Sequence, residues 1–283
     1  MRLRYLSSSE NPDSQIWIFG IPYDGTSSHR PGARFAPDAV RISSEGIESY
    51  SPYQSLDLNG LQFYDYGNIE VPHANPEMMV DEVHGFITGL LMQGKRFLAI
   101  GGEHSISYPI IRACSEQYKN LFVIYFDAHC DMRDSYGGSI YSHASVAKRI
   151  LEVIPSIRFM SFGIRSGDTH EFTFARNLPH FYPFTLNEVK NVLETIPKEA
   201  PVYVTIDLDV IDPGFFPGTG APEPCGIKPG DLLDAVLSFR SLNIVGIDVV
   251  ELCPPADSSG VSATLAAFFI RELLLLFIKE QVE

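Results

Sequence analysis

The apolar run Leu-Phe-Val-Ile-Tyr-Phe at residues 121–126 leads directly into Asp-Ala-His-Cys-Asp at residues 127–131. Six apolar residues in a row, most of them β-branched or aromatic, are typical of a parallel strand that is buried on both faces. Asp127, His129 and Asp131 follow at intervals of two, so in an extended segment their side chains project to the same side. The stretch therefore predicts a buried strand that ends in side chains able to bind a metal ion.

Strand-like and helix-like segments alternate along the rest of the chain. Further runs rich in β-branched and aromatic residues predict strands at residues 16–19, 61–66, 97–100, 157–162, 202–206 and 244–250. Helical spacing of apolar residues predicts helices at residues 76–92, 104–118, 145–154, 186–196, 229–239 and 261–278. Pro76 and Pro229 stand in first helical turns, and Thr185 begins a capping-box pattern. With no linker or repeat, this alternation predicts a single α/β domain over residues 1–283, with a parallel sheet covered by helices on both faces.

Two other predicted strands also end in polar motifs. One leads into Gly-Gly-Glu-His at residues 101–104, where two glycines permit a sharp turn that brings His104 over the sheet edge. Another leads into Asp207 and Asp209. Because ligands bind at the carboxyl ends of strands in such sheets, we expect these side chains to meet those of residues 127–131.

The side chains of these three motifs have the chemistry of a two-metal site. Carboxylate oxygens combined with imidazole suit Mn²⁺ or a related divalent ion better than a structural zinc ion, which favours thiolates. Two bridging carboxylates between ions about 3.5–4 Å apart would form a two-metal clamp, in which the bridging water ionises near neutral pH and becomes the nucleophile. A single motif of this kind is often only a turn or a helix cap. Carboxylates packed this closely repel one another unless a cation is present, which favours the metal interpretation for all three together.

Composition excludes several classes of function. The 283 residues carry a net charge of −14, which argues against a nucleic-acid surface. The charge is compatible with a small cationic substrate, and solubility is the alternative explanation, favoured on charge alone. Four cysteines without a CxxC pair indicate free thiols in a reducing compartment. No signal-peptide stretch follows the N-terminus, and the longest apolar run, residues 273–278, is too short to span a membrane. We therefore expect a cytoplasmic protein without a membrane or nucleic-acid partner.

The motifs resemble the signatures of the ureohydrolases, the family of arginase and agmatinase. The matching segments are GGEHS at residues 101–105, DAHCD at 127–131, DLDVIDP at 207–213 and PGTGAP at 217–222, with IPYD at 21–24, RPGAR at 30–34 and DVVE at 248–251. The resemblance covers nearly the whole chain. It implies a three-layer α/β/α fold around a mainly parallel eight-stranded sheet, as in arginases and deacetylases, with two Mn²⁺ ions per subunit and a homo-trimer or homo-hexamer.

The resemblance also implies a role for each site residue. One ion would be held by His104, Asp127, Asp131 and Asp207, and the other by His129, Asp127, Asp207 and Asp209. Asp127 and Asp207 would thus bridge the two ions, and Asp131 would pass the proton of the hydroxide to the leaving amine. Glu251 would pair with the substrate guanidinium, as a carboxylate can do with a planar cation. His143 matches a mobile proton-shuttle histidine, with a surface loop histidine as the alternative interpretation.

Small departures from the family pattern lie outside the ligands. Cys225 stands where the family usually has a second glycine, and Asn68 replaces a common aspartate. Cys225 is expected to affect loop geometry near the site. Cys130 alternates away from the ligands of its own motif and is interpreted as a packing residue.

The substrate is indicated by loops rather than by the metal motifs. Residues 131–138, 163–167 and 217–220 resemble the agmatinase versions, which predicts hydrolysis of agmatine to putrescine and urea. Arg133 has two interpretations: it holds a carboxylate tail, which favours guanidinobutyrate, or it pairs with Asp134 and is structural, the interpretation we favour. Asp168 could meet the distal ammonium or be a surface loop carboxylate. The alternatives are a ureohydrolase acting on arginine, guanidinobutyrate or formiminoglutamate, a single-zinc deacetylase-like amidohydrolase, and a non-enzymatic member of the family.

Overall fold

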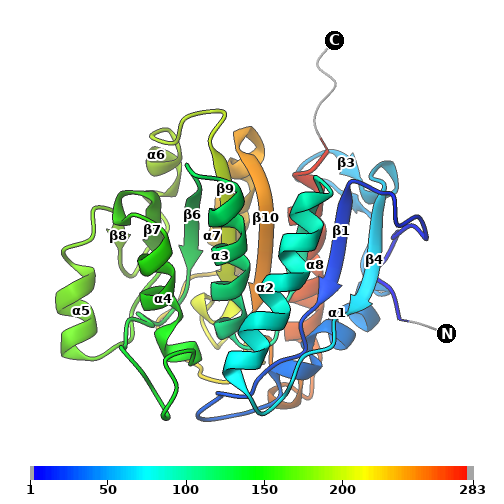
Figure 1. Ribbon diagram of the computed structural model, residues 1–283. Helices are drawn as coiled ribbons and strands as arrows, with labels where there is room; N and C mark the ends of the chain where they lie inside the picture. The colour runs from blue at the N-terminus through cyan, green and yellow to red at the C-terminus, as the bar shows by residue number, and fades with distance from the viewer. Residues whose placement is uncertain (1–2, 279–283) are drawn as a thin grey trace.

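The computed structural model describes residues 3–278, and its centre is an eight-stranded sheet (Figure 1). The strands are β1 Ile16–Gly20, β4 Phe63–Asn68, β5 Arg96–Ile100, β6 Phe122–Phe126, β7 Phe159–Phe162, β8 Phe181–Tyr182, β9 Pro201–Asp207 and β10 Asn243–Val250, in the order β4-β1-β5-β10-β9-β6-β7-β8. Every neighbouring pair is parallel. A separate antiparallel pair is formed by β2 Tyr50–Ser51 and β3 Leu56–Asp57. All carboxyl ends of the large sheet therefore lie along one edge.

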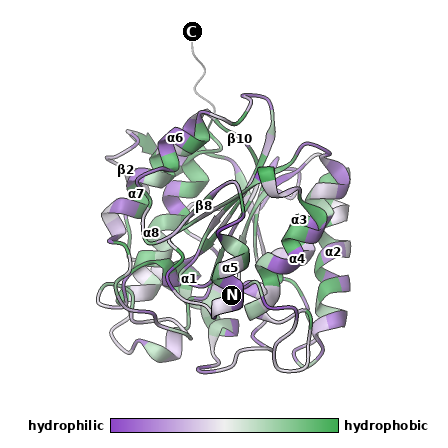
Figure 2. Ribbon diagram, turned by 90° about the vertical axis from the view of Figure 1, so that its left-hand side faces the viewer, coloured by the Kyte–Doolittle hydropathy of each residue, from purple (hydrophilic) through white to green (hydrophobic). Residues whose placement is uncertain are grey.

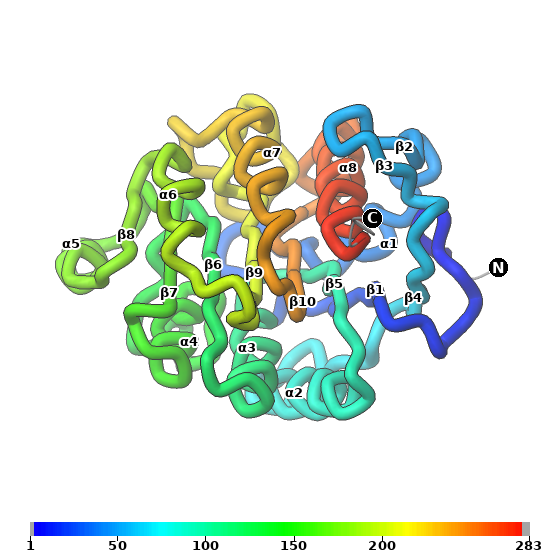
Figure 3. The backbone as a smooth tube through the Cα atoms, turned by 90° about the horizontal axis from the view of Figure 1, so that it is seen from above, coloured from blue at the N-terminus to red at the C-terminus, as the bar shows by residue number. Residues whose placement is uncertain are grey.

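Helices cover both faces of the sheet and complete three layers (Figure 3). They are α1 Ala36–Ser44, α2 Pro76–Met92, α3 Ser107–Gln117, α4 Val146–Val153, α5 Thr169–Ala175, α6 Val189–Leu193, α7 Pro229–Leu237 and α8 Val261–Leu275. Seen from above, α2, α3 and α4 lie on one side of the sheet and α1, α7 and α8 on the other. This arrangement confirms the predicted three-layer α/β/α fold with an eight-stranded sheet.

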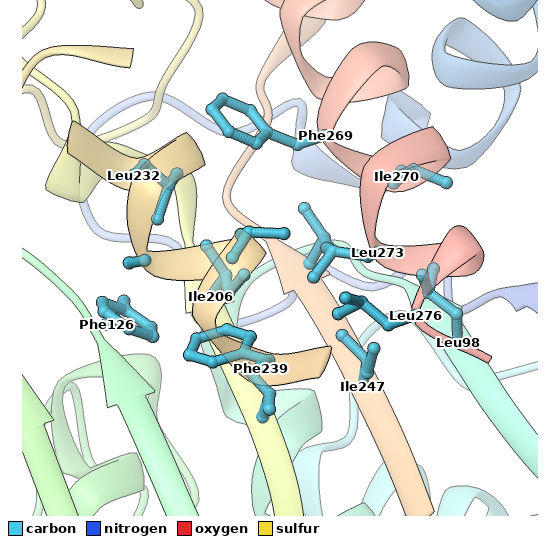
Figure 4. Packing of buried hydrophobic residues seen from close by; sticks show 14 of the residues in the cluster. Leu98, Phe126, Ile206, Leu232, Phe239, Ile247, Phe269, Ile270, Leu273 and Leu276 are labelled. Carbon is cyan, nitrogen blue, oxygen red and sulfur yellow. The ribbon is translucent and has the colours of Figure 1, made fainter. Parts of the chain in front are cut away.

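Two hydrophobic clusters hold the layers together, one on each face of the sheet. The first joins the sheet to α1, α6, α7 and α8, and Figure 4 shows Leu273 of α8 and Leu276, the residue after α8, against Ile247 of β10. The second joins the opposite face to α2, α3 and α4. Seen edge-on in Figure 2, the sheet is largely hydrophobic between the two helical layers. Because both faces are covered, the central strands are apolar at almost every position, which explains the uninterrupted run at residues 121–126.

The predicted elements agree with the structure except where an element is very short. All seven predicted strands are present, with ends that differ by at most two residues from the predicted ones. The two-residue strands β2, β3 and β8 were not predicted, because such short segments show little periodicity, and the helices α1 and α5 were also missed. The helix predicted at residues 186–196 is reduced to α6, and Thr185 accepts a hydrogen bond from the amide of Asn187 without capping it. Within residues 3–278, no helix is long and apolar enough to cross a membrane.

Candidate metal centre

Four neighbouring strands, β5, β10, β9 and β6, deliver the predicted site residues to one place on the sheet edge. His104 begins a 3₁₀ turn after β5, and Glu251 follows β10. Asp207 is the last residue of β9, and Asp209 lies in the 3₁₀ turn that comes next. The strand β6 is followed by Asp127, His129 and Asp131. Since the strands are adjacent and parallel, residues separated by more than a hundred positions in sequence become neighbours.

One group of potential ligands forms around His104. Its Nδ1 atom lies 2.9 Å from Oδ2 of Asp127 and 3.2 Å from Oδ2 of Asp207. Asp131 is slightly farther, with its Oδ2 atom 3.8 Å from the same nitrogen. All four side chains are buried, and His104, Asp127 and Asp207 have the spacing of a metal-binding group.

A second group forms around His129 and shares Asp127 with the first. Nδ1 of His129 lies 2.9 Å from Oδ2 of Asp209 and 3.6 Å from Oδ1 of Asp127. The two oxygens of Asp127 therefore face different histidines, which is the arrangement that a bridging carboxylate needs. The structure brings Asp207 to the first group, and its contact with a second ion stays a prediction.

The environment of His104 provides a test of whether a cation fits the first group. Nε2 of His104 lies 2.9 Å from Oγ1 of Thr205, and the Thr205 hydroxyl donates to Oδ1 of Asp248 at 2.6 Å. Because this hydroxyl proton is used on a carboxylate, its oxygen accepts the proton of Nε2. With that proton on Nε2, the His104 ring presents the lone pair of Nδ1 to carboxylate oxygens, so acceptor atoms face one another. A cation between Nδ1 and those oxygens removes the repulsion, so the residues fit a metal ion.

The ionisation of the other groups indicates the same need for positive charge. Burial and the neighbouring carboxylates raise the pKa of Asp207 well above its usual range, and burial together with Asp127 does the same to the pKa of Asp131. Burial disfavours the charged form of His129, but the carboxylates of Asp209 and Asp127 overcome it and raise its pKa to about 12. Without metal ions, the negative charge of these carboxylates is compensated only by bound protons. Divalent cations would take the place of those protons.

The backbone at Asp131 corrects the extended geometry predicted for its motif. Asp131 has φ +50°, a left-handed conformation that is uncommon for residues other than glycine. This turn directs its carboxylate back towards Tyr125, whose hydroxyl lies 3.3 Å from Asp131 and donates to Asp127 at 2.6 Å. The Tyr125 ring also stacks on His104, with 4.8 Å between ring centroids. Strain at a site residue that neighbouring contacts hold in place is common at functional sites.

The two glycines before His104 have a different role from the predicted one. Neither Gly101 nor Gly102 has a positive φ, so the turn itself does not require them. A Cβ atom on Gly102 would lie 1.8 Å from the carbonyl oxygen of Tyr23, and one on Gly101 would lie 2.4 Å from the side chain of Val250. The glycines therefore permit close packing of neighbouring backbone against the motif.

Glu251 also has a positive φ, of +65°, and is nearly buried at 9% exposure. The backbone N–H of His104 donates to its Oε1 atom at 2.7 Å, which ties the end of β10 to the 3₁₀ turn after β5. Glu251 lines a cavity of about 310 Å³, as do Asp131, Asp207 and Asp209. The structure thus places a carboxylate in the wall of the cavity that contains the candidate ligands.

His143 lies in the wall of the same cavity, at the start of a 3₁₀ turn, His143–Ser145. Its Nδ1 atom lies 3.2 Å from Oγ1 of Thr26, and its Nε2 atom lies 3.3 Å from Oγ of Ser28. Burial and the neighbouring His129 lower the pKa of His143 to about 4. The structure therefore favours a cavity histidine over the alternative of a surface loop histidine.

The partners of Arg133 differ from the expected one. Its guanidinium lies 3.4 Å from Glu171 and 3.8 Å from Asp168, and it covers the ring of Tyr136. Asp134 pairs with Lys148 instead, at 3.3 Å. Arg133 has these partners because the start of α5 packs beside it, and it also lines the cavity, so its structural role stays a prediction. Asp168 is the N-cap of α5, which neither interpretation predicted, and it also lines the cavity, so its contact with a substrate ammonium stays a prediction.

Several residues around the centre were given no role in the sequence analysis. They are Tyr125, Thr205 and Asp248 near His104, and Thr26 and Glu103 near His143. Thr205 and Asp248 did carry a signal, since both are polar residues inside otherwise apolar buried strands. A buried polar residue needs a hydrogen-bond partner and therefore indicates a nearby polar group.

Comparisons with known proteins agree with this geometry. The sequence model of the arginase family matches residues 14–276. An agmatinase from Bacillus subtilis is 41% identical over 278 residues, covering 96% of this chain and 95% of the relative. An agmatinase from Bacillus anthracis is 40% identical over 94% of this chain and 93% of the relative. The crystal structure of an agmatine ureohydrolase of Thermoplasma volcanium has a TM-score of 0.86 at 30% identity, covering 98% of this chain and 94% of that one.

Proposed function

The chain belongs to the arginase family and is an agmatinase-like ureohydrolase, and on that premise we propose that it hydrolyses agmatine to putrescine and urea. The observation that carries the proposal is the pair of histidine–carboxylate groups that share Asp127 and border one cavity. A small cationic guanidino substrate also suits a chain with a net charge of −14, because the field of the protein attracts it.

We propose that the centre holds two Mn²⁺ ions. His104 and Asp131 would serve one ion, His129 and Asp209 the other, and Asp127 and Asp207 both, as the family resemblance implies. When bound, the ions supply stabilisation of negative charge on the substrate and a water of lowered pKa. Imidazole and carboxylate ligands suit Mn²⁺, and Co²⁺ and Ni²⁺ have overlapping preferences, so metal analysis of the purified protein identifies the resident ion.

The protein's own residues would bind the substrate and move protons. Glu251, oriented by the amide of His104, would accept two N–H groups of the guanidinium and hold its plane. Asp131 would take the proton of the attacking water and return it to the nitrogen that leaves as the amine. His143, in the cavity wall, would exchange other protons between the cavity and solvent.

The charges around Arg133 support a substrate with an amine tail, such as agmatine. Glu171, 5% exposed, and Asp168, 43% exposed, both lie beside its guanidinium, so its charge is already compensated. Asp168 remains accessible from the cavity and would meet the distal ammonium of the substrate. A carboxylate tail would instead be repelled by these two side chains.

One observation favours a carboxylate-tailed substrate such as guanidinobutyrate as the second candidate. Arg30 lines the same cavity, and within residues 3–278 no carboxylate forms an ion pair with it. A panel of agmatine, arginine, guanidinobutyrate and formiminoglutamate with added Mn²⁺, read out as urea and formamide, separates the candidates. We expect the highest kcat/KM for agmatine, and better turnover of any other substrate would contradict the proposed tail specificity.

A deacetylase-like site with one zinc ion is the alternative with a different metal content. Two histidines that face different oxygens of Asp127 support two ions instead. Metal analysis of the fully active protein should give two ions per chain, and a value of one would contradict the two-metal proposal. The single domain, the trimeric or hexameric assembly and the cytoplasmic location also stay predictions.

A further inference from the structure

Glu103 is a buried carboxylate outside both ligand groups and is saturated with hydrogen-bond donors. Its side chain is 0% exposed. It accepts from the backbone N–H of Thr26 at 2.8 Å and from three hydroxyls, those of Thr26 at 2.5 Å, Ser105 at 2.5 Å and Ser27 at 3.3 Å. Burial raises the pKa of Glu103 despite the opposing effect of these donors. The four donors match the four lone pairs of its two carboxylate oxygens.

The Thr26 hydroxyl joins this carboxylate to His143. Its proton is donated to Oε1 of Glu103, so it is not available to the histidine. Its oxygen receives the backbone N–H of His143 at 3.0 Å and lies 3.2 Å from Nδ1 of the same ring. With the hydroxyl proton already used, Oγ1 of Thr26 can only accept from Nδ1. The ring nitrogen must then carry the proton.

We propose that Glu103, acting through Thr26, fixes the neutral His143 ring as the Nδ1–H tautomer and leaves Nε2 as the free proton acceptor on the cavity side. The low pKa of His143, about 4, keeps the ring neutral near neutral pH, so it has one proton to place. Nε2 faces Ser28, which lines the cavity together with His143. Glu103 and Thr26 are positioning residues, and their effect on turnover rests on the proton-transfer role proposed above for His143.

Ser142 is the one competing partner for Nδ1 among the described residues. Its Oγ atom lies 3.4 Å from that nitrogen, and its hydroxyl could donate to Nδ1 and favour the opposite tautomer. The contact with Thr26 is shorter, and the same Thr26 oxygen also receives the backbone of His143. Two contacts from one residue to one oxygen hold the ring against Thr26, so we expect Ser142 to have no effect on the tautomer.

The tautomer is measured directly by solid-state ¹⁵N NMR of the full-length protein labelled at histidine. The protein is loaded with Zn²⁺ as a diamagnetic ion, and the His143 signals are assigned from their loss in His143→Asn. We expect a protonated Nδ1 and an unprotonated Nε2 in the unaltered protein. A protonated Nε2 there would overturn the proposal without any variant, so the test does not depend on a substitution being tolerated.

Matched variants test the path through Thr26. Thr26→Val keeps the shape and removes the hydroxyl, so a mixture of tautomers should appear, whereas Thr26→Ser and Ser142→Ala should keep the Nδ1–H form. Glu103→Gln can donate to Thr26 and should also mix the tautomers. An unchanged spectrum in Thr26→Val would overturn the proposal, as would a mixture in Ser142→Ala.

Kinetics separate this inference from the proposed function. On whichever guanidino substrate the protein cleaves, Thr26→Val should lower kcat by about tenfold with little change in KM, because proton transfer by a positioned side chain contributes to the rate rather than to binding. The expected tautomer without agmatine cleavage would contradict the proposed function alone. Agmatine cleavage with a protonated Nε2 would contradict this inference alone.

Discussion

The hydroxyl of Thr205 lies 2.9 Å from Nε2 of His104 and determines which nitrogen of that ring faces the metal centre. Its proton is donated to Asp248, so its oxygen must accept from the histidine. Glu103, Thr26 and His143 repeat this order of carboxylate, hydroxyl and imidazole at the other end of the site. In both places a threonine hydroxyl donates its proton to a buried carboxylate and therefore accepts a hydrogen bond from a histidine.

Removal of the Thr205 hydroxyl should weaken metal binding. Thr205→Val keeps the volume of the side chain but leaves Nε2 of His104 without its acceptor, so Nδ1 is no longer held as the ligand atom. We expect a 10- to 100-fold lower affinity, roughly the effect of losing an outer-shell partner of a ligand. Isothermal titration with Mn²⁺ measures it. Thr205→Ser keeps the hydroxyl and is the control, and equal affinities for the two variants would contradict this role.

Metal removal should destabilise the folded protein, because Asp127 and its neighbours are then left as closely spaced carboxylates. At an Mn²⁺ concentration 100 times Kd, each site adds about 2.7 kcal/mol. In a domain of this size, each kcal/mol corresponds to a shift in Tm of about 2–4 °C. Asp127→Asn should abolish activity and most of the Mn²⁺-dependent rise in Tm measured by calorimetry.

The control for this measurement is Asp134→Asn, which makes the same charge change at a carboxylate that is 90% exposed. It should keep both the activity and the rise in Tm. If Asp127→Asn retained activity, Asp127 would not be a ligand. If it lost activity but kept the full rise in Tm, the ions would bind elsewhere.

Neutralisation of Asp168 should weaken binding of an amine-tailed substrate. Asp168→Asn keeps the helix cap of α5, because asparagine and aspartate are equally good N-caps, and it removes the charge that faces the cavity. Because the variant loses an exposed ion pair with the substrate, we expect KM for agmatine to rise about 2- to 5-fold with kcat little changed. Steady-state kinetics check this, and an unchanged KM would assign Asp168 to capping alone.

Cys225 should be less favourable than the glycine usual at this position in the family. Its φ of +64° is left-handed, a conformation that costs a residue with a side chain about 1–2 kcal/mol. Glycine avoids this cost but loses more chain entropy on folding, so Cys225→Gly should stabilise the protein by about 0.5–1 kcal/mol. Thermal unfolding measures it. Cys225→Ala keeps a Cβ atom and should not be stabilising, and an equal gain in both variants would contradict the backbone explanation.

Much of the fold and the ligand set could be predicted from local sequence patterns. The apolar run at residues 121–126 indicated a strand covered on both faces, and β6 is such a strand. His104, Asp127, His129, Asp207 and Asp209 were also predicted to meet, because each follows a strand and the carboxyl ends of parallel strands share one edge. Periodicity and residue chemistry are local properties, so a single chain is sufficient to read them.

Contacts between distant segments could not be read in this way. The sequence alone determined that a carboxylate and imidazole site lies at the strand ends. Only the tertiary structure decided that Arg133 pairs with Glu171, that Asp131 turns back through a left-handed conformation, and that Thr26 joins Glu103 to His143. Each of these depends on how loops from different strands pack against one another. Side-chain hydrogen bonds between distant segments have no period along the chain, so the chain from Glu103 through Thr26 to His143 could be recognised only in the folded structure.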